Sequence, residues 1–169
     1  MNIVLEHKPK NFLEIGVFCG VTARNTCRLL ADINDHKFNY TGVDLFGDIT
    51  SEDEKVPNYL KKQKFSNPLK NLFYNFILRE KLNSFQSVKK FLNKYSTNIT
   101  LVQGNSNLIL KNLDLKNIDF IFLDGGHSFD TVYRDLELIY SGVKLNSGAV
   151  ILCDDYEDAS YISGVKKAV

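Results

Sequence analysis

The sequence of 169 residues predicts a single α/β domain built on a doubly wound, mainly parallel sheet with helices on both faces. Short apolar segments alternate five times with segments of helical periodicity, which is typical of strands joined by right-handed helical crossovers. The apolar segments also end in glycine, asparagine or acidic residues. Because ligands bind at the carboxyl ends of strands in such sheets, these endings predict one shared site.

Composition limits the partners and the location of the protein. The net charge of +1 gives no reason to expect binding to nucleic acid or to an anionic membrane. The three cysteines, Cys19, Cys27 and Cys153, are scattered and form neither a disulfide framework nor a zinc motif. The first residues are too polar for a secretory signal, and no apolar run reaches the ~18 residues of a membrane span. We therefore expect a cytoplasmic protein.

The first unit is a strand, a glycine-containing loop and a helix. Residues 12–15 have the apolar character of a buried strand end, and Gly16 and Gly20 delimit a tight loop. Residues 21–32 then show helical spacing of apolar side chains. A loop of this kind lets the backbone approach a ligand closely, and the first N–H groups of the helix are available as donors.

The second unit is a strand at 38–46 that carries Asp44 near its end, followed by an insertion at about 47–95. The polar part of the insertion, 47–66, predicts an irregular segment or a lid. Residues 69–95 predict two helices interrupted near 83–84, which cover the sheet or the acceptor site.

The second half predicts three more strands, at 99–103, 118–123 and 149–153. We expect a short helix at 108–113 and a longer one at 129–141. The spacing of the longer helix predicts four inward-facing side chains, Val132, Leu136, Ile139 and Tyr140. Asp135 and Glu137 are interpreted as surface charges, although Asp135 could brace the neighbouring loop from behind.

The loop at 16–20 indicates which nucleotide could bind. Dinucleotide sites need a middle glycine against the pyrophosphate, and Phe18 stands at that position. No Walker sequence is present either. A phosphate-free nucleoside does not need that glycine, and Asp44 could accept hydrogen bonds from both ribose hydroxyls. Asn105 and Ser106 either lie near the base or simply form a turn after their strand.

The segment EIGVFCG at 14–20, together with Asp44, resembles two motifs of class I S-adenosylmethionine-dependent methyltransferases. The resemblance implies a Rossmann-like methyltransferase fold with S-adenosylmethionine as the cofactor. It also implies a set of cofactor-binding residues: Glu14, Gly16, Val17, Phe18, Gly20, Asp44, Asn105 and Ser106.

Residues 118–137 and 148–156 are similar to the branch that includes macrocin O-methyltransferase and the cephalosporin hydroxylases. This resemblance implies that Asp124, Asp154 and Asp155 bind a divalent cation. Three clustered carboxylates repel one another unless a cation or protons compensate them. Oxygen ligands favour Mg²⁺, with Mn²⁺ or Ca²⁺ as alternatives.

The expected reaction is cation-assisted O-methylation of a small hydroxylated acceptor such as a sugar or a secondary metabolite. Asp124 and His127 are the catalytic candidates, because the pKa of histidine suits a general base. Related enzymes carry an acidic base at the position of Gly126, so His127 could instead only cap the following helix or orient Asp124, without proton transfer.

Methyltransferases of this class usually continue beyond the fifth strand with a helix and an antiparallel hairpin. The chain is therefore expected to be truncated after strand five, or to receive that edge from another chain in a homo-oligomer. The early end also leaves open a non-catalytic module that binds S-adenosylmethionine or a partner. An NAD-dependent oxidoreductase is a further alternative, against which Phe18 argues.

Overall fold

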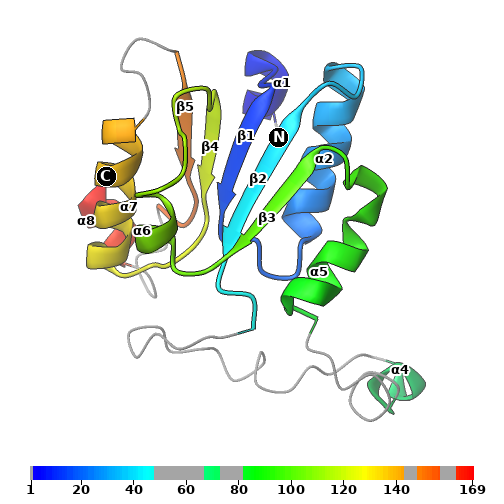
Figure 1. Ribbon diagram of the computed structural model, residues 1–169. Helices are drawn as coiled ribbons and strands as arrows, with labels where there is room; N and C mark the ends of the chain where they lie inside the picture. Colours follow the sequence, from blue (N-terminus) through cyan, green and yellow to red (C-terminus); the bar gives the residue numbers. More distant parts are fainter. Residues whose placement is uncertain (1, 48–66, 73–81, 143–147, 157–162) are drawn as a thin grey trace.

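The computed structural model describes residues 2–47, 67–72, 82–142, 148–156 and 163–169 (Figure 1). Its centre is a five-stranded sheet in which every pair of neighbouring strands is parallel. The strands are β1 (Asn11–Ile15), β2 (Asn39–Asp44), β3 (Ile99–Gln103), β4 (Phe120–Leu123) and β5 (Val150–Cys153). Their spatial order is β3-β2-β1-β4-β5.

This strand order makes the sheet doubly wound, as predicted. The chain moves outward from β1 through β2 to β3, and then returns to the other side of β1 to form β4 and β5. The direction therefore reverses between β1 and β4, which is where ligands bind in open parallel sheets.

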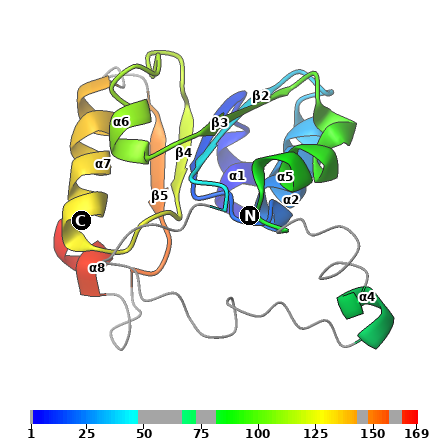
Figure 2. The same ribbon diagram turned by 60° about the horizontal axis from the view of Figure 1, so that its bottom comes forward.

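One face of the sheet is covered by α1 (Asn2–His7), α2 (Val21–Ile33) and α5 (Phe85–Phe91), as Figure 2 shows. The centre of this layer is an aromatic stack in which Phe12 lies between Tyr40 and Phe120, with ring centroids 6.0 and 4.9 Å away. Leu30 of α2 and Val88 of α5 are fully buried against this stack.

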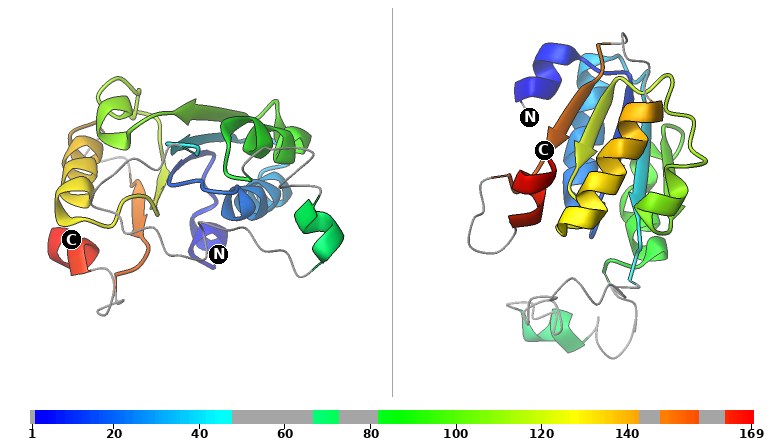
Figure 3. Two further views of the ribbon diagram at one scale, coloured as in Figure 1. Left: turned by 90° about the horizontal axis from the view of Figure 1, so that it is seen from below. Right: turned by 90° about the vertical axis from the view of Figure 1, so that its left-hand side faces the viewer.

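The opposite face is covered by α6 (Ser106–Ile109), α7 (Phe129–Gly142) and α8 (Ser163–Ala168), which are seen from below in Figure 3. Leu13 and Ile15 of β1 pack on this side, because successive side chains of a strand point to opposite faces. Val132 and Ile139 of α7 and Val165 of α8 complete the layer. Two short helices, α4 (Pro68–Leu72) and the 3₁₀ helix η2 (Asn93–Tyr95), lie within the predicted insertion.

All five predicted strands and the two long helices are confirmed, with shifts of only a few residues at their ends. The short helix begins at Ser106 rather than 108, because the Asn105 side chain caps it by accepting a hydrogen bond from the Asn107 N–H. Ser84 caps α5 in the same way, which supports the predicted break near 83–84. The proposed lid at 47–66 lies almost wholly outside the described residues, and so does most of the first helix predicted within 69–95.

Two predictions for the long helix α7 were wrong. Tyr140 is 66% exposed rather than inward-facing, and Asp135 is only 1% exposed rather than a surface charge. The buried stripe runs through Val132, Asp135 and Ile139, whose three- and four-residue steps place them on one side of the helix. Glu137 is exposed as expected and pairs with Arg134.

The N-terminal helix α1 was not predicted, because six residues are too few to establish a helical period. Every helix that the structure describes is too short or too polar to cross a membrane. β5 lies at one edge of the sheet, and association through that edge stays a prediction.

Candidate active site

The sheet register brings the predicted site residues to one edge. Ile15 pairs with both Val43 and Leu123, and Leu123 pairs with Cys153, so four strands end at the same level. The first residues beyond the strands continue this pairing, because Gly16 N–H donates to the Val43 carbonyl and Asp124 N–H to the Ile15 carbonyl, at 2.9 and 2.8 Å. The glycine loop and the acidic residues are therefore neighbours.

The loop after β1 depends on two glycines with positive φ. Gly16 has φ +95°, and a Cβ at this position would lie 1.9 Å from the carbonyl oxygen of Asp124. Gly20 has φ +76° and precedes the first turn of α2. Only glycine allows this close approach without strain. The loop at 16–20 thus lies directly against the loop that follows β4.

Asp44 fastens this loop to the end of β2. Its Oδ2 accepts hydrogen bonds from the backbone N–H groups of Val17 and Phe18, both at 2.8 Å. Its Oδ1 accepts one from Phe46 N–H at 2.6 Å. Because each carboxylate oxygen accepts about two hydrogen bonds, Oδ1 can receive one more in this conformation. The expected binding of two ribose hydroxyls to Asp44 stays a prediction.

Phe18 adopts φ +50°, which is uncommon for a residue with a large side chain. Its N–H donates a hydrogen bond to Asp44, and the residue is 45% exposed at the edge of the sheet that carries the site. Such backbone conformations cost about 1–2 kcal/mol and persist when the surroundings fix them. The two bonds to Asp44 supply that constraint.

Glu14 lies beneath the loop rather than on its surface. Its side chain is fully buried, and its Oε2 accepts a hydrogen bond from the Tyr40 hydroxyl at 2.7 Å. Oε1 is buried without a hydrogen-bond partner among the described residues. Burial raises the pKa of Glu14 to about 8, and the charges of Asp124 and Asp44 add to this effect. Direct contact of Glu14 with a cofactor stays a prediction, since this conformation exposes none of the side chain.

The Glu14→Gln variant should remove a pH dependence of stability. The unfolded pKa is near 4.5 and the folded pKa near 8, so the folded state holds the proton more tightly between these values. Stability of the unsubstituted protein should consequently fall as pH rises through this window, by a few kcal/mol. Urea denaturation at pH 5 and pH 8 would measure the change.

Glu6→Gln provides the control, because Glu6 is exposed on α1 and should leave the slope of stability with pH intact. An equal slope in the Glu14→Gln variant and in the unsubstituted protein would contradict the assignment of that slope to Glu14.

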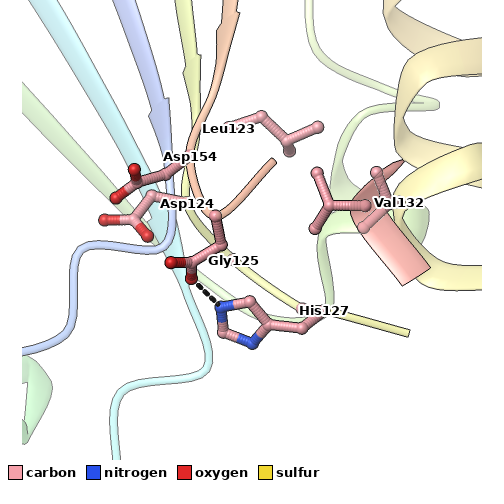
Figure 4. Close-up of a pocket in the computed structure, with 9 residues that line it drawn as sticks. Leu123, Asp124, Gly125, His127, Val132 and Asp154 are labelled. Atoms are coloured by element: carbon pink, nitrogen blue, oxygen red, sulfur yellow. Dashed lines mark ion pairs between the residues drawn. The ribbon is translucent and has the colours of Figure 1, made fainter. Parts of the chain in front are cut away.

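Acidic side chains and a histidine meet beside the loop, as Figure 4 shows. Asp124 follows β4, Asp155 follows β5, and His127 lies in the turn before α7. His127 Nε2 is 3.0 Å from Asp155 Oδ2. One side-chain ligand atom from each of these three residues lies within 4.8 Å of the other two. We call Asp124, His127 and Asp155 the acidic cluster.

The charges of the cluster are compatible with a bound cation. The pKa of Asp124 is raised to about 7, first by burial and then by the negative charges of Asp154 and Asp155. A divalent cation would relieve this repulsion, and oxygen atoms with one imidazole nitrogen form a suitable donor set. Asp154 also lines this pocket, beside Asp124, but does not belong to the group of converging ligand atoms.

The pocket around the cluster has an apolar wall that was not predicted. Leu123, Val132 and Val165 line it together with the acidic residues. Val165 belongs to α8, and a Cβ at the preceding Gly164 would lie 2.2 Å from the His127 carbonyl oxygen. The C-terminal helix thus packs directly on the turn that carries His127. The apolar spacing within residues 163–168 was the signal for this, and six residues are too few to interpret.

Asn105 and Ser106 lie at the turn after β3, next to the end of β2, where Gly104 N–H donates to the Asp44 carbonyl. The side chain of Asn105 is occupied in part by capping α6. Ser106 Oγ donates to Asp135 Oδ2 of α7 at 2.8 Å. The structure therefore brings this turn to the same sheet edge, but directs the Ser106 hydroxyl toward α7.

Residues 13–156 match the family described as a methyltransferase domain. The chain belongs to this family. The match contains the glycine loop, Asp44 and the whole acidic cluster, so both halves of the candidate site lie within the methyltransferase domain. No curated protein matches the sequence.

Several solved methyltransferases share the fold. CalS11, titled a calicheamicin methyltransferase, is 14% identical with a TM-score of 0.63, and the match covers 99% of this chain and 65% of that one. PaMTH1 of Podospora anserina, bound to S-adenosylhomocysteine (SAH), is 18% identical with a TM-score of 0.58, covering 92% and 50%. An O-methyltransferase of Bacillus cereus in complex with SAH is 15% identical with a TM-score of 0.58, covering 99% and 63%. The methyltransferase domain described here thus spans between half and two thirds of these proteins.

Proposed function

We propose that this methyltransferase domain transfers a methyl group from S-adenosylmethionine to a hydroxyl group of a small acceptor, such as a sugar or a secondary metabolite, with help from a divalent cation. The observation that carries the proposal is the contact between the glycine loop and the acidic cluster, whose backbones touch at Gly16 and Asp124. A methyl donor on one loop and an acceptor on the other would be held at reacting distance.

The cofactor half of the proposal relies on the loop at 16–20 and on Asp44. The loop is short, is anchored by two backbone hydrogen bonds to the Asp44 carboxylate, and opens at the switch point of the sheet. Two of the similar structures contain SAH, which supports the choice of cofactor.

The acceptor half relies on the acidic residues. Asp124 and Asp155, together with Asp154, would hold Mg²⁺, whose positive charge lowers the pKa of a neighbouring hydroxyl group. CalS11 is titled a TDP-rhamnose 3′-O-methyltransferase, which supports a sugar or a related metabolite as the acceptor class. The acceptor oxygen forms a bond to the methyl carbon, while the S–C bond breaks and leaves its electron pair on sulfur.

His127 would receive the proton that the acceptor hydroxyl loses. Its Nε2 is 3.0 Å from Asp155 Oδ2, so the Asp155 carboxylate would accept a hydrogen bond from the Nε2–H of the ring while Nδ1 takes the proton. The same pair would fix the orientation of the ring in the pocket.

Calorimetric titration with SAH tests the cofactor half. We expect binding with a micromolar dissociation constant, weakened about tenfold or more by Asp44→Asn, because the substituted oxygen would lose hydrogen bonds that hold the loop. Asp32→Asn is the matched control, since Asp32 is exposed on α2 and should leave the dissociation constant unchanged. A folded protein that fails to bind SAH would refute the proposal.

A non-catalytic S-adenosylmethionine-binding module is the second candidate, favoured by the glycine at position 126, where related enzymes carry an acidic base. SAH binding without methyl transfer to any member of a panel of sugar nucleotides and phenols would favour this candidate.

A further inference from the structure

The buried carboxylate of Asp135 has no role in the proposed reaction, yet it lies behind the part of the site assigned to the base of the nucleoside. Asp135 is 1% exposed in the middle of α7. Its two oxygens accept hydrogen bonds from Ser106 Oγ at 2.8 Å and from Asn107 Nδ2 at 2.5 Å. Both donors belong to the turn and first residues of α6 that follow β3.

Asn107 joins the two helices at a second point, because its Nδ2 also donates to the Thr131 carbonyl of α7 at 3.4 Å. Its backbone N–H donates to the Asn105 side chain, which caps α6. Residues 105–107 are thus held both by hydrogen bonds to α7 and by the Asn105 side chain that caps α6.

The hydrogen bonds from Ser106 and Asn107 offset the cost of burying the Asp135 carboxylate. Burial raises its pKa to about 6, and the hydrogen bonds from Ser106 and Asn107 oppose that rise, so the carboxylate is largely ionised at neutral pH. A buried carboxylate destabilises the folded protein unless its oxygens accept hydrogen bonds. Ser106 and Asn107 therefore hold the turn at 105–107 in contact with α7.

We propose that Asp135 is a positioning residue that fixes the turn at 105–107 and thereby sets the affinity of the site for the adenine of bound S-adenosylmethionine. This inference rests on the proposed function, because it takes the edge next to Asp44 as the nucleoside site. Asp135 does not touch the ligand. It acts through Ser106 and Asn107, which keep Asn105 and Gly104 against the end of β2.

The test compares SAH with S-ribosylhomocysteine, which lacks the adenine. Asp135→Asn keeps the shape of the side chain but replaces one acceptor oxygen with a donor. We expect the dissociation constant of SAH to rise about tenfold, while that of S-ribosylhomocysteine stays within about twofold of its original value. Glu137→Gln removes a carboxylate from the exposed side of the same helix and should change neither value.

A double variant that exchanges the side chains of Asn107 and Asp135 should recover part of the lost SAH affinity. Asn107→Asp combined with Asp135→Asn keeps the hydrogen bond with donor and acceptor reversed, and should restore at least half of the lost affinity on a logarithmic scale. Ser106→Ala removes only one of the two hydrogen-bond donors to Asp135 and should raise the SAH dissociation constant about threefold. This variant tests the proposal if Asp135→Asn does not fold.

The outcomes separate the two hypotheses. If the unsubstituted protein does not bind SAH, the proposed function and this inference both fail. If it binds SAH but Asp135→Asn and Ser106→Ala weaken SAH and S-ribosylhomocysteine equally, or weaken neither, only the positioning role of Asp135 is overturned.

Discussion

The Gly16→Ala variant is expected to lose about 2–5 kcal/mol of stability and to bind neither SAH nor a divalent cation. The added Cβ would lie 1.9 Å from the Asp124 carbonyl oxygen and 2.7 Å from the Gly125 Cα, and backbone atoms cannot move aside as a flexible side chain can. The estimate combines about 1–3 kcal/mol for overpacking with about 1–2 kcal/mol for a non-glycine residue at positive φ. Urea denaturation and calorimetry would measure the three effects.

Gly148→Ala is the matched control. Gly148 has φ +69°, but a Cβ there would meet no atom within 4 Å, so only the backbone cost of about 1 kcal/mol applies. The difference between the two variants isolates the contact between the loops. Equal stability losses in both would show that the loops separate without cost.

The Asp124→Asn variant is expected to gain stability while it loses cation binding. Neutralising Asp124 removes a partly buried charge that Asp154 and Asp155 repel, which should stabilise the cation-free protein by about 1 kcal/mol after allowance for solvent screening. The same change removes a ligand of the proposed cation site. The dissociation constant of Mn²⁺, measured by calorimetry with SAH present, should rise about tenfold or more, because the site loses one of its charged oxygen ligands.

Asp130→Asn tests whether these effects are specific, because Asp130 is exposed in the first turn of α7 outside the cluster. It should change neither the Mn²⁺ affinity nor the stability by a comparable amount. Full cation affinity in the Asp124→Asn variant would refute the metal assignment, whatever its stability.

The sheet and its polar edge could be predicted from the sequence because strands buried on both faces are almost wholly apolar. Phe120–Leu123 shows this. The edge strand Val150–Cys153 is equally apolar although it is only partly buried, and each strand is followed directly by an aspartate. Parallel register then brings the strand ends together whatever the exact boundaries of the strands. The position of Asp44 next to the glycine loop follows from the same register.

The burial and the contacts of individual polar side chains could not be predicted in the same way. Asp135 shares the inward stripe of α7 with Val132 and Ile139, but a charged side chain normally indicates a surface position. The sequence suggested bracing of a loop only as an alternative, because the partners of Asp135 lie on another helix. Asp155 has φ +56°, a turn that brings its carboxylate to His127 and that no residue pattern reveals. The fully buried position of Glu14 depends on Tyr40, which is a diagonal neighbour on β2.

The central position of β1 also determines when the site can form. Asn11 N–H donates to the side chain of Asp119 across 108 residues of chain, at the start of the pairing between β1 and β4. A ribosome must therefore complete β2, the insertion and β3 before the second neighbour of β1 exists. Until then the edge of β1 that pairs with β4 has no partner strand. Pairing β1 with β4 closes the long loop of chain between them, which is slow. We expect the half-sheet of β1, β2 and β3 to form first, and the reaction site to be the last region of the domain to become ordered.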